Sequence, residues 1–419
     1  MPSIDRLSTL PDDLIIRILC FLPTKNSIAT SILAKRWRLL WAHVPHLDFD
    51  SEAPHPIMCC SDIIYNVLSL HKAQTINTFR LRFMDNIFNN EFDDWVKALV
   101  ERNVRKIDVT LDYQLIFLPL CLFSCKTLVD LRLNLCGNIP DWGNVHLPAL
   151  KRLHLDMVGY ESDESLPHLL LGCPVLEELI VDRFVSKPDP KVACLNVNSS
   201  RIIKLVIRSH SCDDHFVYSV RIRTPALRYL LVKDSVSMDI SARSLISLTE
   251  ANINLRNKAP IGGKVAYSIS VLKFVCSLRN VRSLRLSTGL LKVRNSAFSN
   301  IPVKFHYLKK LELDADWGFI SYFLENSDNL ELLTISKGCV PANRWLEPCQ
   351  VPTCLVSRLR TVKIEGFWCS EIEFQLTRYL LENAKVLKRM EIYQSHLKGE
   401  FERISKFERG SESCELLFH

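Results

Sequence analysis

The sequence predicts an α/β protein: a three-helix amino-terminal segment, then an irregular repeat solenoid with a parallel sheet on its concave face, closed by a carboxyl-terminal cap. Three observations lead to this prediction. An apolar phrase recurs about every 26 residues between residues 76 and 392. Apolar residues before residue 50 follow a helical spacing instead, and an amphipathic helix is expected near residue 375.

The first predicted helix begins at Pro11 and ends before Pro23. Proline is tolerated in a first helical turn, where Asp12 and Asp13 also complement the positive end of the helix dipole. The apolar residues of 14–22 cover almost the whole circumference of such a helix. One face can therefore pack internally while another remains for a partner.

Two further helical segments follow within residues 24–41. Thr24 is a candidate N-cap for the second helix, and the third contains the basic cluster Lys35, Arg36 and Arg38, which we assign to its solvated side. A unit of about 40 residues seldom encloses a stable core without a staple, a metal or a partner. The composition favours a partner, and packing of these helices on the larger domain is the open alternative.

Residues 1–50 resemble an F-box. The resemblance rests on the segments Leu10-Pro11-Asp12-Asp13-Leu14, Phe21-Leu22-Pro23, Ser31 to Trp37, and Leu40-Trp41. It implies a module that docks on a Skp-type adaptor, which a cullin and RING scaffold of a ubiquitin ligase holds in turn. By position it assigns adaptor contact to Leu10, Pro11, Leu14, Ile15, Ile18, Leu22, Leu33 and Trp37. Leu19, Phe21 and Trp41 are interpreted as internal packing residues.

Residues 51–340 carry most copies of the repeat phrase, which is an apolar residue, another three places on, and a third two places after that. The last two apolar positions are two residues apart on a short strand, so both side chains point inward. Stacked copies of the phrase then bury a continuous core. Clear copies start at Leu128, Leu150, Leu176, Ile202, Leu227, Val281, Leu308, Leu330, Leu359 and Leu387, and weaker ones at Ile76, Val104 and Leu245. This is the leucine-rich-repeat pattern. The step from Leu245 to Val281 is long, which predicts an uneven region with a protruding loop, a hairpin or an unrecognised repeat.

Residues 341–419 resemble the FBD region that closes many plant F-box proteins, and they contain the terminal repeats. The resemblance rests on Trp345-Leu346-Glu347-Pro348, Leu359-Arg360-Thr361-Val362 and the segment from Arg378 to Ala384. Ser370 and Glu373 have the spacing of a capping box, which predicts an amphipathic helix behind them. We expect this region to cap the solenoid. With the F-box, it identifies the chain as similar to the plant F-box/FBD/LRR-repeat family.

Composition excludes several classes of function. A net charge of +7 over 419 residues, without a block of like charges, predicts neither nucleic-acid nor membrane binding. The longest apolar run, residues 115–123, contains Pro119 and is far shorter than the roughly 20 residues of a membrane span. The amino end lacks the apolar core of a secretory signal, and 15 cysteines without a CxxC pair are interpreted as reduced thiols. We expect a soluble intracellular protein of the nucleus and/or cytoplasm.

No motif predicts catalysis, a cofactor or a metal. A phosphate loop, a nucleophile elbow and an HExxH helix are all missing from the sequence. Cys59-Cys60 and the group His210, Cys212 and His215 lack a second ligand pair at zinc spacing. We therefore expect a receptor subunit that is not itself an enzyme.

Substrate contact is predicted on strand positions that point out of the concave face. Ile180, Val206 and Leu231 would form an apolar strip there, bordered by Asp182, Arg208 and Lys233. The sequence thus predicts a substrate-recognition subunit of a Skp-cullin-F-box ubiquitin ligase for an unknown protein substrate. The alternatives are a repeat scaffold or a small-molecule sensor without a ubiquitin-ligase role.

Overall fold

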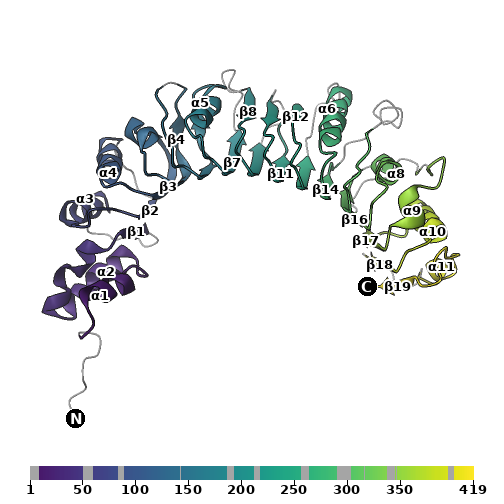
Figure 1. The fold of residues 1–419 in the computed structure, drawn as a ribbon, viewed down its shortest axis with the longest axis horizontal. Coiled ribbons are helices and arrows are strands. Elements are labelled where there is room, and N and C mark those ends of the chain that lie inside the picture. The colour runs from purple at the N-terminus through teal and green to yellow at the C-terminus, as the bar shows by residue number, and fades with distance from the viewer. Residues whose placement is uncertain are drawn as a thin grey trace, which may run out of the picture. The chain divides into compact units, whose positions relative to one another are not determined.

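The computed structural model describes residues 9–50, 60–83, 89–141, 143–185, 193–211, 218–255, 264–289, 303–315, 317–336, 345, 347–394 and 401–419. The chain divides into two compact units, Met1–Arg183 and Phe184–His419. Each unit contains a parallel sheet whose strands come from successive repeats, as predicted. Figure 1 shows that the helices between the strands, such as α4 and α5 in the first unit and α6 and α8 in the second, lie on one side of the main strands of their unit.

The first unit begins with the helical segment and continues into repeats. Its helical segment consists of α1 (Asp12–Leu19), α2 (Thr24–Ala29), η1 (Thr30–Ile32) and η2 (Lys35–His43). The following strands are β1 (His46–Asp50), β2 (Thr78–Phe83), β3 (Lys106–Phe117), β4 (Asp130–Ile139), β5 (Arg152–Asp156), β6 (Gly159–Tyr160) and β7 (Glu178–Val185). Helices α3 (Cys60–Leu70), α4 (Asn89–Glu101), η3 (Leu120–Ser124) and α5 (Ser165–Leu171) connect them. Strands β1 to β5 and β7 pair in chain order, and β6 pairs with β4.

The main sheet of the second unit contains β9 (Lys204–Ser211), β11 (Tyr229–Asp234), β13 (Glu250–Leu255), β14 (Ser283–Ser287), β15 (Lys310–Asp314), β16 (Leu332–Ser336), β17 (Thr361–Phe367), β18 (Arg389–Gln394) and β19 (Glu415–Phe418). These strands pair in chain order. The helices are α6 (Lys264–Ser277), α8 (Trp317–Asn326), α9 (Thr353–Ser357), α10 (Glu371–Asn383) and α11 (Phe401–Ser405). Strand pairing continues without a break through the region predicted to contain the FBD.

The inward strand positions of the clear repeat phrases form the core. Leu131 and Leu133 on β4, for example, are buried and aligned with Leu153 and Leu155 on β5. The same alignment recurs as far as Met390 and Ile392 on β18. The period-2 alternation buries these side chains in every copy, because only stacked neighbours can cover them.

One predicted repeat phrase has the wrong phase. The phrase that was expected to start at Leu245 starts at Leu248, and its inward strand residues are Ala251 and Ile253. Ala251 lies opposite Leu230 and Leu284 on the neighbouring strands. Alanine is only weakly apolar, so Ala251 does not mark the strand in the sequence. The start of the phrase was therefore predicted at Leu245 instead of Leu248. Within the long step, residues 264–277 form helix α6, and residues 256–263, where the protruding loop or hairpin was predicted, lie outside the described residues.

The second unit also contains a second sheet, which was not predicted from the sequence. It consists of the parallel strands β8 (Cys194–Asn198), β10 (Ser219–Arg223) and β12 (Asp239–Arg243). Figure 1 shows β8 and β12 on the opposite side of these repeats from β11. Alternating buried residues such as Leu195 and Val197, or Val220 and Ile222, are the signal that could have revealed it.

Helix α10 confirms the predicted capping box. The Ser370 hydroxyl accepts a hydrogen bond from the Glu373 backbone N–H, and the Glu373 carboxylate accepts one from the Ser370 backbone N–H at 2.8 Å. Leu376, Tyr379 and Leu380 lie on the buried face of this helix. The structure thus confirms an amphipathic helix between the strands of the last two clear repeats.

Candidate interaction surfaces

The amino-terminal helices enclose a small core of their own. Ile15, Leu19, Trp37, Leu40 and Val44 are buried in one cluster, with Leu10, Leu22 and Ala34 packed at its margin. An ion pair at 2.6 Å between Arg36 and Asp12 joins the start of η2 to the start of α1. This pair is exposed and contributes roughly 0–1 kcal/mol to stability. Apolar packing therefore determines how these helices are arranged.

Other large apolar side chains of the same helices face solvent. Leu14 and Ile18 on α1 are each 43% exposed, and Phe21, which follows α1, is 88% exposed. Leu14 and Ile18 are four positions apart and therefore lie on one face of α1. Ile32 and Leu33 at the end of η1 are 87% and 66% exposed. We call these five residues the amino-terminal apolar surface.

The structure separates the residues predicted to contact an adaptor into two groups. Leu14, Ile18 and Leu33 belong to the amino-terminal apolar surface, Pro11 is exposed, and Leu10 and Leu22 are partly buried. Ile15 and Trp37, in contrast, are buried in the core of the helices. The free chain therefore presents little or none of either side chain to a partner, and their assignment to direct contact stays a prediction.

Two further predictions about these helices are corrected. Leu19 and Trp41 are buried as expected, but Phe21 is exposed, because it lies beyond the last turn of α1 rather than over the core. Thr24 does not cap α2 through its side chain, and its hydroxyl instead accepts a hydrogen bond at 2.8 Å from the Asp48 backbone N–H. Ile32 was missed, because it lies in a 3-10 turn where the 3.6-residue period does not apply.

The helical segment is joined to the first repeats by strand pairing and a buried histidine. β1 pairs with β2 in parallel, from His46 opposite Thr78 to Asp50 opposite Arg82. His71 Nε2 donates to the Val44 carbonyl oxygen at 2.8 Å, and Nδ1 accepts from Arg102 Nη1 at 3.3 Å. The segment is therefore held at a defined position in the first unit instead of hanging on a loose linker.

The His71 contact predicts a pH dependence. Burial lowers the pKa of His71, and the nearby Arg102 charge lowers it further, although the hydrogen bond to Val44 opposes both. The unfolded value is about 6.5. A lowered pKa in the folded state means that this contribution to stability is complete above pH 6.5 and is lost as the pH falls through the folded-state pKa.

We expect amide exchange of residues 40–50, corrected for intrinsic rates, to accelerate between pH 7.5 and pH 5.5. A His71→Gln variant, which cannot titrate at this position, should show a smaller acceleration. His46 also has a pKa lowered by burial, so the variant should retain part of the effect. An identical pH response in both proteins would contradict the assigned role of His71.

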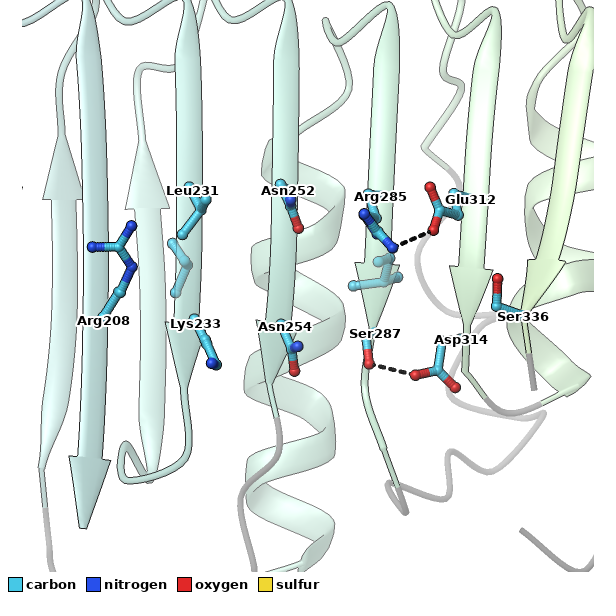
Figure 2. Close-up of a pocket in the computed structure, with 12 residues that line it drawn as sticks. Arg208, Leu231, Lys233, Asn252, Asn254, Arg285, Ser287, Glu312, Asp314 and Ser336 are labelled. Atoms are coloured by element: carbon cyan, nitrogen blue, oxygen red, sulfur yellow. Dashed lines mark hydrogen bonds and ion pairs between the residues drawn. The ribbon is translucent and has the colours of Figure 1, made fainter. Parts of the chain in front are cut away.

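The second candidate surface is the open face of the main sheet in the second unit. Two outward positions on each strand form rows across it, and their side chains are drawn in Figure 2. These side chains line a groove of about 300 Å³. Leu231 and Asn252 belong to one row, and Lys233 and Asn254 to the next. Arg285 and Glu312 form an ion pair at 2.7 Å, and Ser287 donates a hydrogen bond to Asp314 at 2.8 Å.

The predicted substrate strip is only partly present on this face. Ile180 and Asp182 lie on β7 at partly exposed outward positions. Val206 and Arg208 on β9 lie opposite Leu231 and Lys233 on β11, so the structure brings these four residues together. Val206 is only 3% exposed, however, which contradicts its assignment to an exposed strip. A short side chain placed among the longer Lys204, Arg208 and Leu231 is readily covered by them.

Possible metal ligands and thiol groups are the remaining chemical features of the described residues. No group of three or more potential metal ligands occurs there. The described cysteines are free thiols, and burial raises the pKa of Cys136, Cys173 and Cys354 to about 12. Cys59, Cys212 and His215 lie outside the described residues. No described helix has the length and apolar character that crossing a membrane requires.

Comparisons with known proteins match both the amino-terminal helices and the repeats. An F-box domain model matches residues 7–48, and the model described as "At1g61320/AtMIF1, LRR domain" matches residues 67–415. F-box/FBD/LRR-repeat protein At3g52680 of Arabidopsis thaliana is 31% identical, with 99% of this chain and 93% of the relative covered. F-box/FBD/LRR-repeat protein At4g00160 of the same plant is also 31% identical, with 99% and 94% covered.

Proposed function

The chain belongs to the F-box/FBD/LRR-repeat protein family, and from this premise we propose that it is the substrate-recognition subunit of a Skp-cullin-F-box ubiquitin ligase. In this role the F-box docks on a Skp-type adaptor, which connects it to the cullin and RING subunits. The repeats capture a target protein. Residues 51–340 supply the repeats, and residues 341–419 supply the FBD region and the terminal repeats that cap the solenoid.

The amino-terminal apolar surface is the observation that carries this proposal. Leu14, Ile18 and Phe21 remain in water although the neighbouring Ile15 and Leu19 are buried. Burial of an exposed leucine, isoleucine or phenylalanine side chain contributes roughly 1.5–3 kcal/mol, so this surface is suited to docking on an apolar partner. The Skp-type adaptor is the partner that F-box membership implies.

The connection between the F-box and the first repeats supports a role in positioning a target protein near the ubiquitin-transferring enzyme. Pairing of β1 with β2 and the His71 contacts give the F-box a defined orientation relative to the first repeats. A receptor that holds a target lysine near a ubiquitin-charged enzyme accelerates transfer by proximity and orientation. The partner enzymes then supply the chemistry, and this chain acts in the nucleus and/or cytoplasm, where free thiols such as those of its described cysteines persist.

Co-purification with a recombinant Skp-type adaptor tests the proposal. The wild-type chain should retain the adaptor, and replacement of both Leu10 and Pro11 by alanine should weaken retention severalfold. The purified complex should then stimulate ubiquitin chain formation when cullin, RING and E2 components are added. If the adaptor does not co-purify, the chain acts as a repeat scaffold outside the ligase, and the proposal fails.

A further inference from the structure

Three arginines gather on the outward face of the three-stranded sheet in the second unit. Arg221 and Arg223 are two positions apart on β10, and Arg243 lies directly opposite Arg223 on β12. All three side chains are exposed, and they line one groove of about 450 Å³. We call these three residues the outer arginine surface, because Figure 1 shows β12 on the opposite side of these repeats from β11 of the main sheet.

The neighbouring strands supply no acidic partner for these arginines. The residues opposite Arg223 are Asn198 on β8 and Arg243 on β12, and Arg221 lies between two uncharged residues. None of the three arginine side chains forms an ion pair or a hydrogen bond with any residue that the structure describes. Like charges directly opposite each other destabilise a sheet. An anionic ligand would relieve the repulsion between Arg223 and Arg243.

Outward cations of the main sheet, in contrast, have an acidic residue on the next strand. Arg285 on β14 is paired with Glu312 on β15 at 2.7 Å, and Lys363 on β17 is paired with Glu391 on β18 at 2.6 Å. In both pairs the two residues lie directly opposite each other in the strand register. A cross-strand acid of this kind is what the outer arginine surface lacks, so its positive charge is available to a partner.

The chemistry of the groove favours a peptide as that partner. Guanidinium groups bind carboxylates and phosphates through paired N–H donors. Asp239 lies on the same outward face of β12, four positions before Arg243, and would repel a long nucleic-acid backbone. Asn196 and Ser241 lie on either side of Arg221 in the strand register, and both side chains can donate to and accept from peptide groups.

The spacing of the arginines favours a pair of carboxylates. Arg221 and Arg223 are separated by two residues of extended chain, which is about 6.6 Å. Acidic side chains two positions apart on an extended peptide have the same spacing and point to the same side. A single phosphate group has no second charge to place at that distance.

We propose that the outer arginine surface captures an extended target segment with two acidic residues two positions apart. One carboxylate meets Arg221, and the other lies between Arg223 and Arg243. The inference rests on the proposed function, because it names the kind of target segment that the ligase subunit would recognise. It also places this contact on the side of the repeats opposite the main sheet.

Selection from a random twelve-residue phage-displayed peptide library on the full-length chain tests the inference. The wild-type chain should enrich peptides in which two acidic residues are separated by one other residue. Fluorescence anisotropy then measures the affinity of a selected synthetic peptide. Arg223→Glu should weaken this peptide on the order of tenfold or more, because it replaces an attractive charge by a repulsive one. Higher salt should weaken the wild-type interaction as well.

Two altered peptides test the spacing, and one protein variant is the matched control. Moving one acidic residue to the adjacent position places the two carboxylates on opposite sides of the extended chain, so affinity should fall severalfold. Replacing the acidic pair by a single phosphoserine should also lower affinity. Lys310→Glu should leave affinity unchanged, because Lys310 is an exposed cation on β15 of the main sheet.

Thermal unfolding separates a binding role of these arginines from a structural one. Arg243→Gln should lose peptide affinity and unfold at the wild-type temperature or above it, because it removes the repulsion of Arg223. A loss of affinity confined to variants that also unfold at a lower temperature would overturn the inference. Enrichment of peptides without an acidic pair, no enrichment, or tighter binding of the phosphoserine peptide would overturn it too.

Adaptor retention measured in the same samples distinguishes this inference from the proposed function. All of these variants should retain the adaptor, because their substitutions lie in the second unit and the F-box lies in the first. Failure of the wild-type chain to bind the adaptor would refute the ligase role. Peptide selection indifferent to Arg223 and Arg243, with the adaptor still bound, would refute only the role of the outer arginine surface.

Discussion

Replacement of Leu14 and Ile18 by aspartate should abolish adaptor capture without unfolding the F-box. Both side chains are 43% exposed on one face of α1, so the new carboxylates remain hydrated in the free protein. In the complex they would be forced against apolar side chains of the partner. Central apolar contacts of an interface typically contribute 2 kcal/mol or more each, so we expect a loss of affinity of roughly 100-fold or greater.

Calorimetric titration with the adaptor measures this effect, and thermal unfolding of the free variant tests its fold. Leu171→Asp is the matched control, because Leu171 is 79% exposed at the end of α5 in the same unit. The control should bind with wild-type affinity. Exposed substitutions of this kind usually change stability by no more than about 0.5 kcal/mol. Wild-type affinity of the Leu14 and Ile18 variant would exclude this surface as the docking site.

Replacement of Leu19 by alanine should weaken the F-box from within. Leu19 is fully buried in the cluster with Ile15, Trp37, Leu40 and Val44. Truncation of a buried leucine to alanine costs about 2–5 kcal/mol through lost transfer energy and the cavity left behind. A core this small has few other contacts to offset that loss, so residues 9–50 should open locally while the repeats remain folded.

Hydrogen exchange followed by mass spectrometry separates this effect from global unfolding. Protection should fall in residues 9–50 and stay unchanged in the strands of the second unit. Saturating adaptor should restore the lost protection, because a ligand that binds only the folded segment stabilises it by mass action. Leu171→Ala, which removes an exposed leucine, is the control. Unchanged protection in the Leu19 variant would show that this cluster is not what holds the helices together.

Much of the fold could be predicted from local alternation. Each strand of the repeats has to bury two inward side chains, and that requirement is visible in pairs such as Leu311 and Leu313 wherever both residues are large and apolar. The pattern could not be recognised at Ala251, because the inward residue there is small. The predicted capping box at Ser370 was also correct, because its hydrogen bonds join residues three positions apart.

The adaptor surface could be predicted only in part. Resemblance located the segment, but membership in a motif does not say which apolar residues face inward. Ile15 and Leu14 are neighbours of the same chemical kind, and the structure buries the first and exposes the second. The difference depends on where η2 packs with Trp37 and Leu40, which lie more than twenty positions away in the chain.

By itself, the sequence determined the class of the protein, the repeat period and the location of the F-box, because these follow from patterns between residues close together in the chain. Only the tertiary structure decided the phase of the Leu248 repeat, the burial of Val206 and the rows of outward side chains across the main sheet of the second unit. Those features depend on strand register, which places side chains about 25 residues apart in the chain against each other.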